Sequence, residues 1–363
     1  MKTFKKITLK FCLLLVFSFT LSCTVTSQNE QPKLPKSYIA YHTNETITID
    51  GKAEEASWKK VAWSDDFIDI QGVKKPKYRT RVKMMWDDTH LYFYAELEEP
   101  HIWANLKKRD TVIFYNNDFE IFIDPNGDGN PYYEFEMNAF NTIWDLVITK
   151  PYRDFGHVFT NWDYKNAKTA VHIDGTLNNP SDVDKKWSVE IAFPWKAINE
   201  TFDDKIIAPK GKIWRVNFSR VNWDYELINN AYQRKKDKKT GEYLHEYNWV
   251  WSPQEVINMH QPERWGYVYF SEKNIDEKDV FVYGKDEVLK LKIYEIHRAL
   301  RKYYKSHTVW DKKLIPSSIM VNNKEIKINS EINIIGYTLS LKSPFTSKMY
   351  YMSENGKLIN QLK

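Results

Sequence analysis

The sequence predicts a mainly β fold, in which an antiparallel β-sandwich over residues 38–272 is followed by a small α+β unit over residues 273–363. Apolar and polar residues alternate with a period of two in many short stretches, and turn-forming residues separate those stretches. After residue 273 the spacing becomes helical and the charge balance becomes basic, which marks a second unit.

Alternation is clearest in stretches that are each about as long as an ordinary strand. They cover residues 79–86, 90–98, 118–124, 132–140, 142–149, 187–193, 214–221 and 267–271. Turn signals such as Pro125-Asn126-Gly127-Asp128-Gly129 lie between them. Many short strands with short connections and few long helices are typical of a sandwich or barrel, so we expect a sandwich rather than a parallel-sheet fold.

The smaller unit begins with a predicted helix over residues 286–306. Its apolar residues recur at helical spacing and can share one face: Val288, Leu291, Ile296, Ala299, Leu300 and Tyr303. Alternating stretches return at 319–321, 332–341 and 348–351, which predicts three or four strands packed with the helix. Residues 274–363 carry a charge of +6, but their basic residues are scattered, so a solvated surface is favoured over a docking patch.

The N-terminus has the pattern of a secretory signal peptide over residues 1–22. Four lysines precede an uncharged stretch of 12 residues from Phe11 to Ser22, which is shorter than the ~20 residues that span a membrane. The end of this stretch, Leu21-Ser22-Cys23, resembles a bacterial lipobox. We therefore expect lipidation of Cys23 and anchoring to a bacterial outer membrane, with ordinary signal cleavage as the alternative. Residues 23–37 are polar and predict a tether.

Composition narrows the classes of partner. The net charge is +5, and it falls to +1 once the four lysines of the signal are set aside. A near-neutral chain argues against nucleic acid as a partner, because phosphate binding needs a basic surface. The chain also holds 14 Trp, 23 Tyr and 19 Phe. Such rings suit sheet cores and also flat ligand platforms.

One predicted sheet face carries carboxylates and amides. Alternation places Asp118 and Glu120 on the face opposite Phe119, and in the next strand it places Glu134, Glu136 and Asn138 opposite Phe135. This face is either the wet outer side of an antiparallel sheet or a polar surface that binds a ligand rich in hydroxyl groups. The residues alone leave both interpretations open.

Six short motifs, in order over residues 45–271, resemble family 9 carbohydrate-binding modules and the wider class of DOMON-type sandwiches. They are Ile49-Asp50-Gly51 with Glu55 and Trp58, Trp86-Asp87-Asp88, Glu120-Ile121-Phe122-Ile123-Asp124, the run from Trp187 to Trp195, the run from Trp214 to Arg220, and Trp265-Gly266-Tyr267. The resemblance implies a jelly-roll-like sandwich that binds sugars, often beside a glycoside hydrolase and sometimes with structural calcium.

The expected sugar-binding residues combine aromatic and polar side chains. The resemblance implies roles for Glu120 and Asn138, and Glu136 stands where the family carries Arg. The best-known members clamp a sugar between two Trp. In this sequence Trp249 and Trp251 flank Val250 in the expected loop region and could form one platform, with Trp103 and His260 at its rim. Buried packing is the alternative role for each Trp, and a plain surface imidazole is the alternative for His260.

The loop after residue 123 has the D-x-N-x-D-G spacing of calcium loops. Asp124, Asn126 and Asp128 are the predicted ligands of a structural calcium ion. The alternative is a plain turn, which Asn-Gly and Asp-Gly favour by themselves.

No motif of nucleophilic, zinc-protease, phosphate-loop or dinucleotide chemistry occurs. The leading expectation is therefore a non-catalytic carbohydrate-binding lipoprotein that takes part in polysaccharide capture or degradation, with a glycoside hydrolase as a candidate partner. The alternative is a glycoside hydrolase or an associated subunit that uses a carboxylate pair among Asp118, Glu120, Glu134 and Glu136. A scaffold without a ligand is the third interpretation.

Overall fold

The computed structural model describes residues 31–198 and 208–361, which include the whole predicted sandwich except residues 199–207. The predicted signal peptide and the lipidation site at Cys23 lie outside the described residues. Within them, no helix is long and apolar enough to span a membrane.

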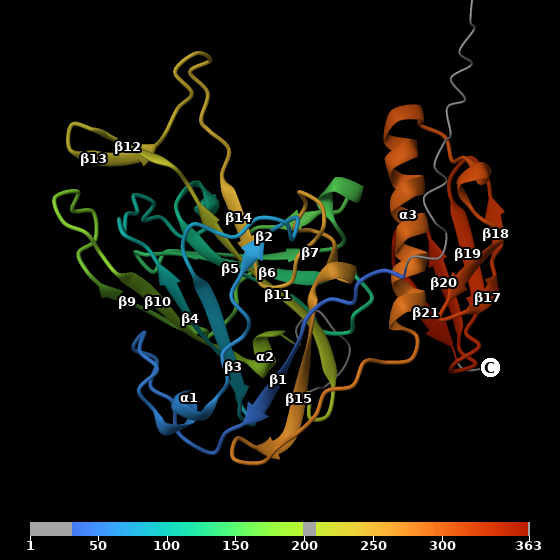
Figure 1. Ribbon diagram of the computed structural model, residues 1–363, viewed down its shortest axis with the longest axis horizontal. Coiled ribbons are helices and arrows are strands. Elements are labelled where there is room, and N and C mark those ends of the chain that lie inside the picture. Colours follow the sequence, from blue (N-terminus) through green and yellow to red (C-terminus); the bar gives the residue numbers. More distant parts are fainter. Residues whose placement is uncertain (1–30, 199–207, 362–363) are drawn as a thin grey trace, which may run out of the picture. The chain divides into compact units, whose positions relative to one another are not determined.

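Thirteen strands of the described residues join in one sheet, in the order β8-β7-β6-β5-β11-β15-β1-β3-β4-β10-β9, with β14 and β2 extending it beside β11 (Figure 1). Their bounds are β1 Ser37–His42, β2 Ile68–Asp69, β3 Thr80–Trp86, β4 His90–Glu98, β5 Asp118–Asp124, β6 Tyr132–Asn138, β7 Ile143–Ile148, β8 Val158–Phe159, β9 Lys168–Asp174, β10 Lys186–Pro194, β11 Ile213–Asn222, β14 Tyr247–Val250 and β15 Gly266–Asn274. A hairpin of β12 (Tyr225–Ile228) and β13 (Ala231–Arg234) and the short helices α1 (Ala56–Lys60) and α2 (Trp195–Ile198) lie between these strands in the chain.

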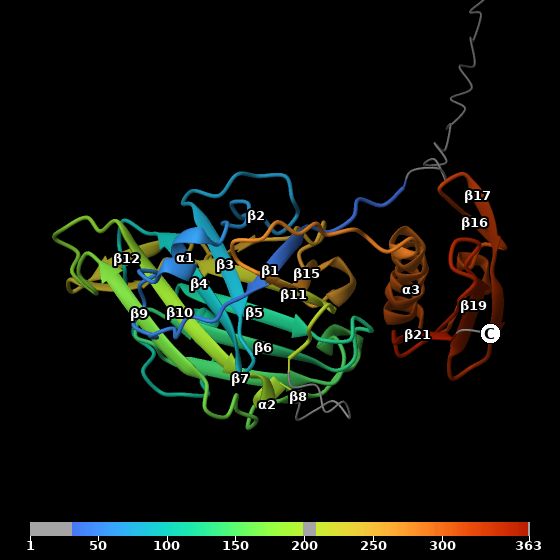
Figure 2. The same cartoon turned by 90° about the horizontal axis from the view of Figure 1, so that it is seen from below.

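The sheet folds back on itself to form the predicted sandwich. Every pairing in it is antiparallel except those of β1, which runs parallel to both β15 and β3 and so joins the two halves. One large apolar cluster draws residues from both halves, including Ile121 and Phe135 from β5 and β6, and Phe93 and Ile191 from β4 and β10. Figure 2 shows these strands from a second direction. The mainly β class and the antiparallel sandwich are confirmed.

The alternating stretches of the sequence coincide closely with the observed strands. Residues 118–124 are β5 to the residue, and the predicted segment 132–140 becomes the slightly shorter β6. Alternation did not identify β1, β9 or β14. The strand β9 is only half-buried along most of its length, so its apolar residues do not mark one face clearly.

Residues after 274 form the expected small α+β unit. It contains helix α3 (Glu287–His307), β16 (Ser318–Val321), β17 (Lys324–Lys327), β18 (Asn329–Ile332), β19 (Tyr337–Lys342), β20 (Met349–Ser353) and β21 (Leu358–Gln361). Leu289, Ile293 and Leu300 of α3 pack with sheet residues in a second apolar cluster. The stretch predicted as one strand over 332–341 is interrupted, because the backbone turns at residues 333–336 between β18 and β19.

Candidate functional site

The polar face of β5 and β6 is buried and does not form a wet outer surface. Cross-strand pairing aligns Ser219 of β11, Glu120 of β5, Glu136 of β6 and Trp144 of β7 in one row across four neighbouring strands. Side chains that are direct cross-strand partners lie on the same face of the sheet. The sequence therefore places two carboxyl groups beside each other in this row, with an indole ring at its edge.

A pocket with a volume of about 250 Å³ lies over this row. Its lining includes the carboxyl groups of Glu120, Glu134, Glu136 and Glu246, the rings of Phe114, Trp144, Tyr152 and His260, and the polar ends of Arg153, Asn248 and Asn258. A small apolar cluster that includes Phe122, Leu146 and Met259 packs between the sheet and the loop after β14. The pocket thus combines acidic groups with aromatic rings, and loop residues form one side of it.

The carboxyl groups of Glu120, Glu134 and Glu136, which line the pocket, and that of the neighbouring Asp118 are here called the carboxylate floor, and all four are almost completely buried. Burial raises the pKa of Glu120 to about 7. Burial and then the neighbouring acids also raise the pKa values of the other three carboxyl groups well above their ordinary range. At neutral pH Glu120 is therefore close to half-ionised, and the raised pKa values of its three neighbours favour their protonated forms.

His260 lines the pocket as the sequence predicted, but it is not a surface imidazole. Its Nδ1 lies 2.7 Å from the Tyr132 hydroxyl, and its ring packs edge-on against Tyr152. Burial lowers the pKa of His260 to about 3, so the ring is neutral at physiological pH. A neutral imidazole can both donate and accept hydrogen bonds.

Three of the predicted ligand residues do not reach the pocket. The indoles of Trp249 and Trp251 do share a face, but it is the core face, where both are almost fully buried in the main apolar cluster. Trp103 is equally buried and stacks on Tyr232 in a separate cluster. The expectation of an exposed loop platform is therefore wrong in this structure, because the strand register turns both indoles inward.

Asn138 is also placed away from the pocket. Its amide nitrogen donates to the carbonyl of Leu106, and its Oδ1 accepts from the backbone N–H groups of Phe140 and Thr142. These bonds hold the turn between β6 and β7. Its predicted role as a ligand contact is thus replaced by a structural one, because its donor and acceptor groups already have protein partners.

Two aromatic residues of the pocket, Trp144 and Tyr152, are not among the ligand residues predicted from the sequence. Trp144 is half-buried, lines the pocket, and has a buried indole nitrogen without a hydrogen-bond partner. A signal for it exists in β7, whose sequence Ile143–Ile148 is apolar on both faces except at Asp145. Such a strand is covered on both sides, so something must lie over its second face.

The predicted calcium loop closes as a tight turn. The carboxyl oxygens of Asp124 accept from the backbone N–H groups of Gly127 and Gly129, at 2.9 and 2.8 Å. Asn126 Nδ2 donates to Asp128 Oδ2, which also pairs with Lys357 at 3.0 Å. A calcium ion needs a shell of free oxygen ligands. These oxygens are engaged by protein donors, so the residues as placed do not fit the ion.

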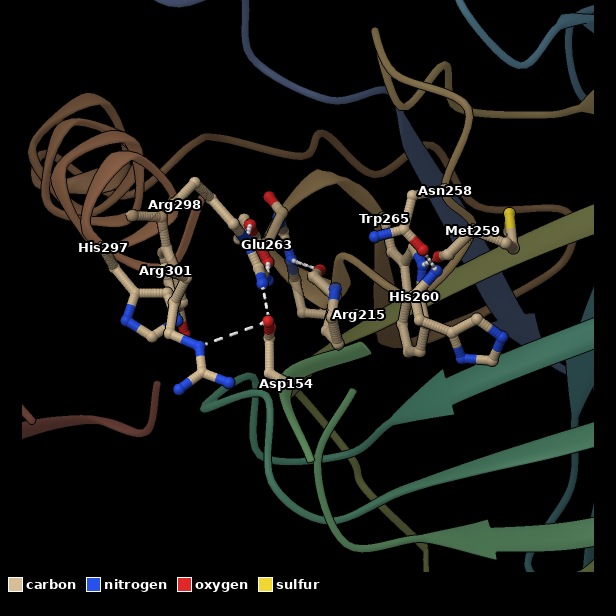
Figure 3. Close-up of polar contacts among 12 residues, drawn as sticks. Asp154, Arg215, Asn258, Met259, His260, Glu263, Trp265, His297, Arg298 and Arg301 are labelled. Carbon is tan, nitrogen blue, oxygen red and sulfur yellow. Dashed lines mark hydrogen bonds and ion pairs between the residues drawn. The ribbon is translucent and has the colours of Figure 1, made fainter. Parts of the chain in front are cut away.

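Two walls of the pocket are connected through helix α3. Arg298 makes a bidentate ion pair with Glu263, at 2.6 and 2.8 Å, and a further ion pair with Asp154 (Figure 3). Asp154 directly follows Tyr152 and Arg153 of the pocket lining, and Glu263 follows His260 by three residues. One guanidinium therefore holds two segments that are about a hundred residues apart in the chain.

Residues 49–213 match the family described as carbohydrate family 9 binding domain-like. Exoglucanase XynX of Acetivibrio thermocellus is 28% identical over 153 residues, which are 42% of this chain and 12% of that protein. Endo-1,4-beta-xylanase C of Paenibacillus barcinonensis is 32% identical over 100 residues, which are 28% of this chain and 9% of that protein. The chain thus spans only about a tenth of the length of these curated relatives.

Among solved structures, a proposed carbohydrate-binding protein from Bacteroides uniformis ATCC 8492 aligns with a TM-score of 0.48 and 15% identity, over 65% of this chain and 99% of that one. A family 9 carbohydrate-binding module from Caldicellulosiruptor kristjanssonii, in complex with cellotriose, aligns with a TM-score of 0.41 and 17% identity, over 69% of this chain and 100% of that one.

Proposed function

Residues 49–213 carry the match to the carbohydrate family 9 binding domain-like family, and from this premise we propose that the protein binds carbohydrate without cleaving it, in the pocket above β5, β6 and β7. The carboxyl groups of Glu120 and Glu136 accept hydrogen bonds from sugar hydroxyls, and the ring of Trp144 covers an apolar C–H face of the sugar. The volume of about 250 Å³ suits a single sugar ring better than a long chain.

The single observation that carries this proposal is the meeting of Trp144 with the carboxylate floor in one pocket. The cross-strand partner of Trp144 is Glu136, so the ring and the acid are neighbours by register. The buried indole nitrogen of Trp144 has no protein partner among the described residues. Because a buried N–H group normally finds an acceptor, a ligand hydroxyl is a suitable partner for it.

Binding is favoured over hydrolysis by the arrangement of the acids. The carboxyl oxygens of Asp118, Glu120 and Glu136 lie within 4.8 Å of one another on one face of the sheet. A glycosidase instead places its two carboxyl groups on either side of the scissile bond. A hydrolysis assay on each bound sugar tests this point, and release of reducing ends would contradict the non-catalytic role.

We place the protein at a bacterial outer membrane, anchored through a lipid on Cys23 and serving polysaccharide capture beside a glycoside hydrolase. The signal-like residues 1–22 and the tether at 23–37 support the anchor. The similarity to part of an exoglucanase and to part of an endo-1,4-beta-xylanase supports a role in polysaccharide capture.

Isothermal titration with gluco-, xylo- and amino-oligosaccharides tests the proposed site. Trp144→Ala should weaken binding by about 1–3 kcal/mol, or roughly tenfold to a hundredfold, because a partly buried aromatic contact is lost. Trp63→Ala is the matched control, since Trp63 is also half-buried but packs against Arg81 on β3, in the other half of the sheet. Equal affinities of the wild type and Trp144→Ala would contradict this pocket as the site.

A further inference from the structure

The carboxylate floor has no cationic partner within residues 31–198 and 208–361. None of its four carboxyl groups forms an ion pair with a Lys, Arg or His among the described residues. The buried cation Arg220 acts on Asp118 from a distance, but its guanidinium is bonded to Glu99 at 2.6 Å. His260 is neutral, and Arg153 stands at an exposed part of the pocket lining. Buried acids are normally paired, so this floor is unusual.

A second acidic cluster in the same protein shows how such a group is ordinarily compensated. Asp110, Asp145 and Asp163 also bring their carboxyl oxygens within 4.8 Å of one another. There, Arg109 donates to Asp145 at 2.5 Å and to Asp163 at 2.7 Å. The protein thus supplies its own cation to that cluster, and the described residues supply none to the carboxylate floor.

One buried polar atom of the floor also lacks a partner. Asp118 Oδ2 has no hydrogen-bond partner among the described residues, and its side chain is fully buried. Each unpaired buried polar atom destabilises the folded state, and such groups commonly mark a place that a ligand completes.

The hydrogen-bonding capacity of the floor indicates what the ligand must bring. A bound cation favours the ionised form of these carboxyl groups over the protonated form that burial favours. In the ionised form they only accept hydrogen bonds, and one acceptor of Glu136 is already taken by the N–H of Phe114 at 3.0 Å. An ammonium group brings three donors and a positive charge in one compact group. It therefore matches buried carboxylates better than a neutral hydroxyl, which brings one donor and no charge.

We propose that the pocket selects a sugar unit with a free, protonated amino group, such as a glucosamine residue of a deacetylated oligosaccharide. This inference rests on the proposed carbohydrate-binding function and narrows its ligand class. The ammonium lies on the carboxylate floor, where it pairs with Glu120 and Glu136. The sugar ring lies against Trp144, whose face also favours a nearby cation.

The aromatic walls favour an organic cation over a bare metal ion. A divalent metal needs oxygen ligands around it and gains nothing from Trp144, Tyr152 and Phe114. The lining of the pocket also extends beyond the converging carboxyl groups of Glu120 and Glu136, since Glu246, Asn248 and Asn258 belong to it. A ligand of ring size uses both regions.

Titration of the full mature chain with three matched trisaccharides tests the inference: chitosan trisaccharide, its fully N-acetylated form, and cellotriose. At about pH 7 we expect the free amine to bind roughly tenfold to a hundredfold more tightly than the other two, as a charge-assisted hydrogen bond allows. Glu136→Gln should remove most of this preference while weak binding of cellotriose remains. Asp163→Asn, in the compensated cluster, should leave the preference unchanged.

The outcomes separate the two proposals. If cellotriose or the N-acetylated sugar binds as tightly as the free amine, the amino-sugar inference is overturned and the carbohydrate-binding function stands. If no sugar of any class binds, the proposed function itself fails. Saturable binding of calcium or magnesium that requires Glu136, without binding of the amine, would identify a metal site and overturn the inference. The comparison of the three sugars needs no variant, so it holds even if Glu136→Gln folds poorly.

Discussion

Replacement of Glu120 by Gln should make the protein more stable at alkaline pH. Glu120 is buried in the sheet, and burial raises its pKa from about 4.5 to about 7. In the unfolded chain the carboxyl group loses its proton near pH 4.5, whereas in the folded protein it keeps the proton until about pH 7. Over this interval the folded state binds more protons than the unfolded state, so the free energy of unfolding falls as the pH rises.

The size of the effect follows from the difference between the two pKa values. At 1.36 kcal/mol for each unit, the carboxyl group lowers the free energy of unfolding by about 3 kcal/mol above pH 7, and by nothing below pH 4. Gln has the same shape and no charge to bury. We therefore expect Glu120→Gln to be about 3 kcal/mol more stable than the wild type at pH 8 and to be equally stable at pH 4.

Urea unfolding monitored by tryptophan fluorescence, at half-unit steps from pH 4 to pH 8, measures this difference. Glu242→Gln is the matched control, because it removes the same charge from an exposed loop and should leave the profile unchanged. A variant that is less stable than the wild type at pH 8, with an unchanged slope between pH 4 and pH 7, would refute the reasoning. That result would mean that an unidentified cation already compensates Glu120.

Four further outcomes are expected. Trp251→Ala should cost about 3–5 kcal/mol in urea unfolding, since its ring fills the core; an undiminished stability would contradict that burial. Arg298→Gln should cost about 3–5 kcal/mol and weaken sugar binding in titration, because Glu263 is left buried without a cation and Asp154 keeps only its longer ion pairs with Arg301 and Lys305. Calcium or a chelator should leave the melting temperature of the mature protein unchanged. A clear rise with calcium would instead support calcium binding at the loop of Asp124, Asn126 and Asp128. Cys23→Ala should move the protein from the membrane fraction to the soluble fraction, whereas retention at the membrane would contradict lipidation.

The fold was predictable because alternation reports burial on one face. The strand β5 coincides with its predicted bounds because Phe119, Ile121 and Ile123 face the main core, while Asp118, Glu120 and Asp124 alternate with them and Phe122 is the one apolar residue on the other face. The same reasoning assigned Glu120 and Glu136 to a common face, and their cross-strand pairing follows from the turn between β5 and β6.

The residues that line the pocket were harder to predict, because they depend on which face of the sheet is covered by a loop. Trp249 and Trp251 share a face as expected, but alternation cannot tell the core face from the ligand face when both faces are buried. The pairing of β14 with β11, which settles the question, joins residues about thirty positions apart. The role of Tyr152 was equally hidden, since it reaches the pocket from a short turn with no periodic signal.

Because Arg298 of α3 pairs with Asp154 and Glu263, the pocket depends on residues that lie outside the matched family segment. The family match ends at residue 213, the first residue of β11, whereas Ser219, His260 and Arg298 all follow it. A transplanted segment of residues 49–213 would carry Glu120, Glu136 and Trp144 but would lack one wall of their pocket. A chain cut after β15 would leave Asp154 and Glu263 buried without a counter-ion. An exchangeable unit for ligand binding must therefore include helix α3 as well as the sandwich, and a chain that keeps only the sandwich should fold but bind its proposed ligand more weakly.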